Sequence, residues 1–457
     1  MDQSNKSNKT SLINNQKQNI FTPILIYRKC NECNKNRKKF DKTQQICHLC
    51  IKAKTIPLSG NKVIDDFIRY TQTNNYEKDR RMEFVPFDNF KDVSFVAEGG
   101  FSKIYKAIWI NGPITNWSEK KQKYNRRKNM TVALKELNNS KNLNSKELNE
   151  LKIYYSCKYR TAYINKYYGV TQNPATKNFM IITNYYELGD LTRYITNNFF
   201  NITWKDKLSK LFDIITGLKL IHDSHIIHKD YHSGNIFINP SAITGDLGLS
   251  KSSLGNDEDN DIYGIVPYVA SEVLREQKYT KASDIFSFGM IMWELMTGRR
   301  PFRDKNHDAE LIIEICDGVR PPIVTNVPEG YIELMHQCWH SDPNEDQQPM
   351  IFIAESPDIG PATANNPDAI YRSRSLSAMI KSAESTRSLE SQNIRLKFEG
   401  KRKFNDSLFK ADEINKKIKL PENNELELGI DIDIDIQSNN NDYITEEINF
   451  DIDIPAG

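Results

Sequence analysis

Residues 228–238 read HKDYHSGNIFI, and the triplet Asp246-Leu247-Gly248 follows eleven positions after the asparagine of that stretch. The stretch places Asp230 five positions before Asn235 and continues into an apolar run of strand character. An aspartate can orient an incoming hydroxyl group, and carboxylate and amide oxygens are ligands that Mg²⁺ prefers. Because a glycine permits a sharp turn after Asp246, we predict that the two segments form one site for Mg²⁺ and a nucleotide.

Two further motifs lie upstream of this stretch. Residues 97–107 read AEGGFSKIYKA, and small residues between two strand-like segments let backbone amides approach phosphate oxygens closely. Lys135 follows an apolar strand-like run and is expected to hold phosphates, with Glu150 as its anionic partner and Glu147 as the fallback. An ordinary glycine-rich turn and a solvated lysine are the alternatives when either motif stands alone.

Two motifs also lie downstream, namely Ala270-Ser271-Glu272 and DIFSFG at residues 284–289. Apolar segments of strand length come early in the chain, whereas segments of helical length and spacing, such as residues 204–223, come later. Strands first and helices afterwards are typical of an α+β fold. The fixed order and spacing of these motifs is specific, although each motif alone is weak.

In this order the motifs resemble those of the eukaryotic protein kinases, specifically the tyrosine-kinase-like group, over roughly residues 90–345. The Asn-, Lys- and Ile-rich composition with leading cysteine pairs is similar to kinases multiplied in some fungi. The resemblance implies a two-lobed α+β fold, with a β-rich small lobe, a helical large lobe and ATP in the cleft between them. It also implies a protein substrate that accepts the γ-phosphate of Mg-ATP.

The resemblance implies a role for each matching position. Asp230 would be the catalytic base, Asn235 and Asp246 the Mg²⁺ ligands, and Lys135 the partner of Glu150. Asp284 would brace the catalytic loop from the next large helix. The implied nucleotide contacts include the phosphate loop, Thr183 at the entrance to the deep pocket, and the hinge at 184–186. Ala133 and Phe237 would sandwich adenine. In full, they are Ala97, Gly99, Gly100, Ser102, Ile104, Ala133, Lys135, Thr183, Asn184, Tyr185, Tyr186 and Phe237.

Several positions depart from the family pattern. Ala97 and Ser102 stand where the phosphate loop usually has glycine, and Lys229 stands where arginine usually precedes the catalytic aspartate. Gln348 replaces the arginine that usually pairs with Glu272. These departures keep open an alternative in which the chain is a kinase-shaped scaffold with little activity.

The acceptor residue is suggested by the sequence near the catalytic aspartate. His232 and Ile265 stand where serine/threonine kinases usually have lysine and threonine, whereas Tyr268 in Val266-Pro267-Tyr268 resembles the Ser/Thr arrangement. The sequence therefore favours serine or threonine over tyrosine as the acceptor.

Four of the seven cysteines form two pairs, Cys30-x2-Cys33 and Cys47-x2-Cys50. This pattern is typical of a structural zinc site with four thiolate ligands and no open position. Disulfides and idle thiols are the alternatives. Basic residues around the pairs permit nucleic-acid binding, but a solvated face is the simpler interpretation.

Composition excludes several classes of protein. A net charge of +2 over 457 residues argues against a protein that coats nucleic acid. The polar N-terminus does not match a secretory signal, and no apolar run approaches the ~20 residues that cross a bilayer. We expect an intracellular protein, cytoplasmic or nuclear, with reduced thiols; the sequence predicts no oligomeric state.

The same patterns predict the domain boundaries. Residues 421–457 carry 11 acidic and no basic side chains, which is typical of a disordered acidic tail. The expected organisation is a disordered leader at 1–22, a zinc-ribbon-like segment at 23–57, a linker with a short helix at 58–83, a protein kinase domain at 84–354 and a disordered tail at 355–457.

Overall fold

The computed structural model describes most of the region between residues 27 and 390. The described ranges are 27–38, 45–74, 80–100, 102–142, 148–157, 162–253, 261–323, 327–339, 359–362 and 365–390. The leader expected at 1–22, the C-terminal end of the domain expected at 84–354 and the acidic end of the tail lie outside the described residues.

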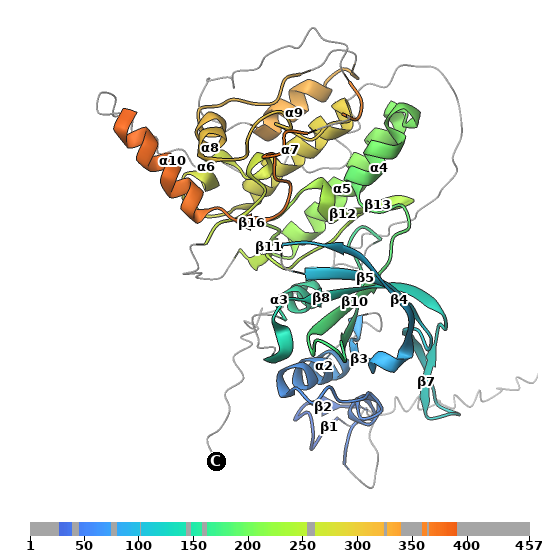
Figure 1. Ribbon diagram of the computed structural model, residues 1–457. Coiled ribbons are helices and arrows are strands. Elements are labelled where there is room, and N and C mark those ends of the chain that lie inside the picture. The colour runs from blue at the N-terminus through green and yellow to red at the C-terminus, as the bar shows by residue number, and fades with distance from the viewer. Residues whose placement is uncertain are drawn as a thin grey trace, which may run out of the picture. The chain divides into compact units, whose positions relative to one another are not determined.

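The N-terminal half of the described chain is dominated by a six-stranded sheet with the strand order β3-β9-β10-β8-β5-β4 (Figure 1). All neighbours in this sheet are antiparallel except β3 and β9, which are parallel. The strands are β3 (Glu83–Phe84), β4 (Phe90–Glu98), β5 (Ser102–Trp109), β8 (Met130–Leu137), β9 (Tyr167–Gln172) and β10 (Phe179–Asn184). A separate hairpin pairs β6 (Ile114–Ser118) with β7 (Lys123–Arg126).

Strand β8 shows how the sequence sets the two faces of this sheet. Val132 and Leu134 are buried in a cluster around Trp109. Because successive side chains of a strand point to opposite faces, Lys135 lies on the other face, where it reaches α3 (Asn149–Ser156).

Helices dominate the region after β10. They are α4 (Leu191–Asn198), α5 (Trp204–Asp223), α6 (Ser271–Leu274), α7 (Lys281–Thr297), α8 (Ala309–Cys316) and α9 (Tyr331–Trp339). The short strands among them are β11 (Ile226–Ile227), β12 (Ile236–Asn239), β13 (Ser241–Thr244), β14 (Lys251–Ser252) and β15 (Tyr263–Gly264). The largest hydrophobic cluster lies here and surrounds α7, most of whose side chains are buried.

Local sequence explains where the two longest helices begin and end. Thr203 and Asp206 form a reciprocal capping box at the start of α5, and Thr280 and Ser283 form one at the start of α7. Each box satisfies backbone N–H groups that have no partner within the helix. Helix α7 ends at Gly298, whose φ of 76° lies in the left-handed region that glycine tolerates best.

The segment expected to be a linker is part of the sheet-rich region instead. The expected short helix is present as α2 (Lys62–Asn74), and it buries Ile64 and Phe67 in the cluster that also contains Leu151 of α3. Tyr155 of α3 contacts the helix as well, because the Phe67 and Tyr155 ring centroids lie 6.3 Å apart in an edge-to-face arrangement. The apolar face of α2 therefore packs behind the helix that carries Glu150.

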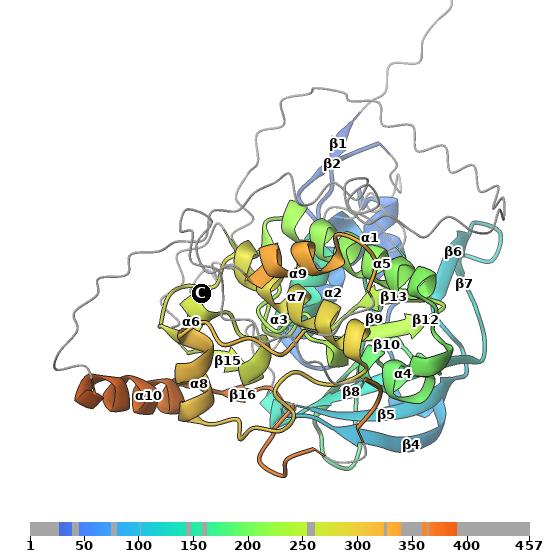
Figure 2. The same cartoon turned by 90° about the horizontal axis from the view of Figure 1, so that it is seen from above.

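The expectation of a disordered tail from residue 355 onward is wrong for residues 365–390. This segment contains β16 (Arg374–Ser375), which pairs with β15, and α10 (Ser377–Glu390), which lies beside α8 (Figure 2). Leu376, Ile380 and Ala383 are buried in the large helical cluster. Their spacing of four and three residues forms a helical stripe that the low overall apolar content of the segment obscures.

The cysteine-bearing segment near the N-terminus contains β1 (Arg28–Lys29), β2 (Asn36–Arg37) and α1 (His48–Ala53).

Among the helices of the described chain, none has both the length and the apolar composition that a bilayer crossing requires.

Candidate functional site

Lys135 lies between two carboxylates. Its Nζ is 2.8 Å from Oε2 of Glu150 and 2.5 Å from Oδ1 of Asp246. Tyr167 donates from its hydroxyl to the other oxygen of Glu150 at 2.8 Å, which fixes the carboxylate in place. Burial alone would lower the pKa of Lys135, but the charges of Asp246 and Glu150 outweigh burial and raise it, so the ammonium group stays charged.

The β12–β13 hairpin brings Asn235 and Asp246 to the same end of the helical region. Ile236 pairs with Thr244 at that end of the hairpin, and the backbone N–H of Gly245 donates to the carbonyl of Asn235 at 2.9 Å. The ten residues between the two predicted Mg²⁺ ligands therefore form a tight hairpin that returns the chain to its starting point.

Asp230 and Asn235 are joined within one loop. Nδ2 of Asn235 donates to the backbone carbonyl of Asp230 at 2.8 Å, and its distance to Oδ2 of Asp230 is 3.4 Å. Because the amide nitrogen is engaged in this way, Oδ1 of Asn235 is the atom left for a cation. A carboxylate and an amide oxygen form a donor set that suits Mg²⁺.

Asp284, at the start of α7, holds the loop that carries Asp230 through two hydrogen bonds and also contacts His222 of α5. Its carboxylate accepts from the backbone N–H groups of His228 at 2.8 Å and Lys229 at 2.9 Å, and it lies 2.8 Å from Nε2 of His222. The two backbone hydrogen bonds fix the chain at Lys229, where φ is positive at 71°; φ is also positive at Asp246, at 53°. Such conformations are uncommon for residues other than glycine and cluster at functional sites.

The charge of Asp230 is set by two neighbours. His232 lies beside it, with Nε2 3.6 Å from Oδ2, and Ser373 of the tail segment donates its hydroxyl to both carboxylate oxygens at 2.8 and 2.7 Å. Burial would raise the pKa of Asp230, but His232 and these hydrogen bonds outweigh it and lower the pKa. Asp230 is thus an ionised carboxylate in contact with a hydroxyl group.

The residues predicted to contact a nucleotide lie on strands β4, β5, β8 and β10, on the segments that follow β4 and β10, and on β12. Gly99 and Gly100 connect β4 to β5, where the N–H of Gly99 donates to the carbonyl of Ser102 at 2.8 Å. Thr183 of β10 pairs with Ala133 of β8, the strand that also carries Lys135. Ala97 of β4 pairs with Ile104 of β5. Asn184 is the last residue of β10, and Tyr185 and Tyr186 follow it.

Phe237 makes a contact that the sequence did not predict. Its ring stacks on that of Tyr186, with the centroids 5.1 Å apart and the planes 12° apart. Tyr186 also donates to Oδ1 of Asn165 at 2.9 Å. Phe237 was expected to face adenine together with Ala133, and Tyr186 was expected in the hinge; the stacking contact buries Tyr186 against one face of the Phe237 ring.

Sequence reasoning missed Tyr167, Glu294 and Ser373. No motif spacing includes Tyr167 or Glu294, since each acts through a contact between distant segments. Ser373 lies in a Ser- and Arg-rich stretch that has the composition of a disordered tail. The helical spacing of Leu376, Ile380 and Ala383 is the sequence signal that could have indicated a folded segment here.

Glu294 of α7 is buried and contacts the loop that carries Asp230 and Asn235. Its carboxylate accepts from the hydroxyls of Tyr268 at 2.6 Å and Ser233 at 2.9 Å. Burial raises the pKa of Glu294 from 4.5 to about 7. The native state therefore holds a proton on Glu294 that the unfolded chain releases at lower pH, and native stability falls as the pH rises from about 4.5 to above 7.

We expect Glu294→Gln to raise the free energy of unfolding above pH 7 by up to about 3 kcal/mol, because the amide cannot ionise and each pKa unit is worth about 1.4 kcal/mol. The advantage should shrink as the pH falls and vanish near pH 4.5. Thermal melts between pH 5 and 8.5 measure this difference. Glu276→Gln, at an exposed position, is the control, and a gap that does not depend on pH would contradict the assignment.

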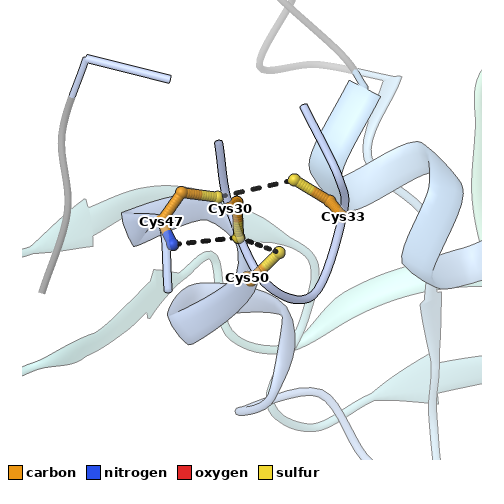
Figure 3. A group of neighbouring side chains, drawn as sticks. All are labelled: Cys30, Cys33, Cys47 and Cys50. Atoms are coloured by element: carbon orange, nitrogen blue, oxygen red, sulfur yellow. Dashed lines mark hydrogen bonds between the residues drawn. The ribbon is translucent and has the colours of Figure 1, made fainter. Parts of the chain in front are cut away.

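The four paired cysteines form a separate cluster near the N-terminus, in which the sulfur atoms point toward one another (Figure 3). The Sγ atoms of Cys30 and Cys50 are 3.8 Å apart, as are those of Cys33 and Cys47, and all four lie within 4.8 Å of one another. Four Zn–S bonds of ~2.3 Å in a tetrahedron separate neighbouring sulfurs by ~3.8 Å. The cluster is thus compatible with a structural zinc ion.

Comparison with known proteins agrees with this geometry. The family described as protein tyrosine and serine/threonine kinase matches residues 91–350. A protein of Acanthamoeba polyphaga mimivirus named as a serine/threonine-protein kinase/receptor, R831, is 32% identical over 171 residues, covering 36% of this chain and 10% of that protein. Dictyostelium discoideum drkD, named as a probable serine/threonine-protein kinase, is 26% identical over 265 residues, covering 57% of this chain and 19% of that protein.

A vertebrate protein is also similar to this chain. Ephrin type-A receptor 5 of Gallus gallus is 32% identical over 178 residues, covering 37% of this chain and 17% of the receptor. The chain thus matches between 10% and 19% of the length of these three relatives.

Proposed function

The chain belongs to the protein tyrosine and serine/threonine kinase family, and from this premise we propose that it transfers the γ-phosphoryl group of Mg-ATP to a protein hydroxyl group. Serine and threonine are the favoured acceptors, in keeping with relatives named as serine/threonine-protein kinases. The fold would be the two-lobed kinase fold, with the six-stranded sheet in the small lobe and α4–α9 in the large lobe.

The observation that carries this proposal is the Glu150–Lys135–Asp246 arrangement, with contacts of 2.8 and 2.5 Å. Glu150 orients the ammonium group, which would neutralise charge on the nucleotide phosphates. Mg²⁺, when bound by Asn235 and Asp246, supplies further neutralisation of the phosphate oxygens. Asp230 would align the acceptor hydroxyl and take its proton as the bond to phosphorus forms.

The scaffold alternative is supported by the phosphate loop, where Ala97 and Ser102 stand in place of glycines. The two functions separate when purified full chain is incubated with radiolabelled Mg-ATP beside the Asp246→Ala variant. A kinase incorporates label that the variant loses, whereas equal, background-level label in both proteins favours the scaffold.

We expect Lys135→Met to lower kcat/KM for phosphoryl transfer by about 10²–10³-fold, because it removes one fixed positive charge from the transition state. Methionine keeps the apolar stem, so the circular dichroism spectrum should match the wild type. Lys91→Met on strand β4, at an exposed position, is the matched control. Unchanged turnover in Lys135→Met would refute the phosphate-holding role of this lysine.

We propose that Cys30, Cys33, Cys47 and Cys50 bind one structural Zn²⁺. The ion would order a short segment that cannot form a large core of its own. The segment is also linked to α2, because the guanidinium of Arg37 donates to the carbonyl of Thr73 at 2.5 Å.

An intracellular location, cytoplasmic or nuclear, and membership of the tyrosine-kinase-like group stay predictions from the sequence.

A further inference from the structure

A serine of the tail segment touches the residue predicted to act as the catalytic base. The Ser373 hydroxyl donates to Oδ1 of Asp230 at 2.8 Å and to Oδ2 at 2.7 Å, across 143 positions of sequence. In phosphoryl transfer to a protein, the acceptor hydroxyl must reach this carboxylate within hydrogen-bonding distance. Ser373 therefore occupies the place of an acceptor.

The segment around Ser373 is held as an extended strand. Arg374 pairs with Gly264 in the antiparallel β15–β16 pair (Figure 2). The N–H of Leu376 then donates to the carbonyl of Ile262 at 2.8 Å. Addition of a strand to an exposed strand edge is a common way of binding a peptide, in which the backbone supplies affinity and side chains supply register.

Side chains on both sides of Ser373 anchor this register. Tyr371 donates from its hydroxyl to the carbonyl of Pro301 at 2.8 Å, and Arg374 donates to the carbonyl of His307 at 2.6 Å. Leu376 is fully buried, at 0% exposure. Anchors before and after the serine keep its hydroxyl on Asp230, so the contact does not depend on a single hydrogen bond.

The phosphate loop lies on the other side of the serine. A Cβ atom added at Gly100 would lie 2.5 Å from the backbone carbonyl oxygen of Ser373, so the two backbones are in close contact and only glycine fits. Ser373 is thus between the loop expected to cover the nucleotide phosphates and the carboxylate expected to receive a proton.

We infer that Ser373 is a phosphoacceptor for the active site of its own chain, an inference that rests on the proposed kinase activity. Oγ of Ser373 forms a bond to the γ-phosphorus of Mg-ATP while the bond from that phosphorus to the β–γ bridging oxygen breaks. The hydroxyl proton passes to Asp230, and the products are phosphoserine, ADP and a proton that is later released to water.

Phosphorylation changes the stability of this arrangement. Before the reaction, residues 371–376 fill the acceptor position and compete with other protein substrates. Afterwards the phosphate carries about −1.5 to −2 charges at pH 7 beside the ionised Asp230, and like-charge repulsion disfavours the docked strand. The modified tail therefore leaves the acceptor position and opens it to other substrates.

The test uses dephosphorylated full chain incubated with Mg-ATP and casein as a general acceptor, with phosphosites mapped by mass spectrometry over time. We expect phosphate on Ser373 of the wild type and none there in Asp246→Ala. We also expect a lag in casein phosphorylation that ends as Ser373 becomes modified. Ser385→Ala is the matched control, because Ser385 is exposed, lies outside the docked residues 371–376 and should leave phosphorylation of Ser373 unchanged.

Transfer within one chain is tested by mixing wild type with a tagged Asp246→Ala chain. Modification of Ser373 only on the wild-type chain, at a rate independent of protein concentration, supports the inference. Equal modification of the tagged chain overturns it. Labelled casein with unmodified Ser373 overturns the inference and leaves the proposed kinase activity standing, whereas unlabelled casein together with unlabelled chain overturns both.

Discussion

Asp230→Asn is expected to lower kcat for phosphoryl transfer by about 10²–10⁴-fold, the range typical for removal of a general base. Asparagine keeps the size of the side chain but cannot take the proton of the acceptor hydroxyl. The loop should stay folded, because Asp284 holds its backbone through the N–H groups of His228 and Lys229.

The measurement is steady-state transfer of labelled phosphate to casein at saturating ATP, together with a thermal melt. Asp304→Asn makes the same chemical change at an exposed position of the helical region and should keep wild-type activity. A melting temperature within a few degrees of the wild type separates lost catalysis from lost folding. An Asp230→Asn enzyme with more than a tenth of wild-type kcat would exclude Asp230 as the base.

Replacing Cys30 and Cys50 together by serine is expected to remove one zinc ion per chain and to unfold the segment around β1, β2 and α1. Binding of structural zinc contributes about 10–16 kcal/mol in small peptides, and the apolar cluster of this segment is small, with Ile46 and the cysteines as its buried members. The ion pairs that Glu32 makes with Lys54 and Arg69 would be lost with it.

Metal analysis of the purified chain and limited proteolysis of residues 27–57 measure both effects. Cys157→Ala changes a buried cysteine outside the cluster and should keep one zinc ion per chain. A strong chelator should reproduce the protease sensitivity of the double variant. Wild-type protein that contains no zinc and titrates with seven free thiols would contradict the proposal.

The N-terminal segment and the active site are connected through packed helices. Helix α1 contacts α2, and α2 packs against α3 through Phe67 and Tyr155. Helix α3 carries Glu150, which orients Lys135. The folded state of the cysteine segment thus bears on the placement of the Lys135–Glu150 ion pair through a chain of packed helices.

Much of the candidate site could be predicted from sequence spacing. Asp230 and Asn235 share one loop, and a hairpin of fixed length returns Asp246 to the same end. Glu150 was chosen as the partner of Lys135 from a helical pattern, and the two side chains form an ion pair at 2.8 Å. In each case the geometry follows from short-range structure or from a pairing that opposite charges favour.

Other contacts could not be predicted, because they join segments that are unrelated in local pattern. Tyr167 reaches Glu150 only because β9 lies next to α3 in space. The packing of the helix in the expected linker and of residues 365–390 in the expected tail could not be predicted for the same reason. A sparse apolar stripe such as Leu376 and Ile380 becomes a core element only when a complementary surface is present to bury it.

The sequence by itself determined the kinase family, and it predicted the ionisable groups of the candidate site and the cluster of four cysteines, because these depend on residue type at fixed short spacing. Only the tertiary structure decided that α2 braces α3 and that Ser373 rests on Asp230. Burial and strand pairing between distant segments are collective properties, so their free energy exists only once the partners have been brought together.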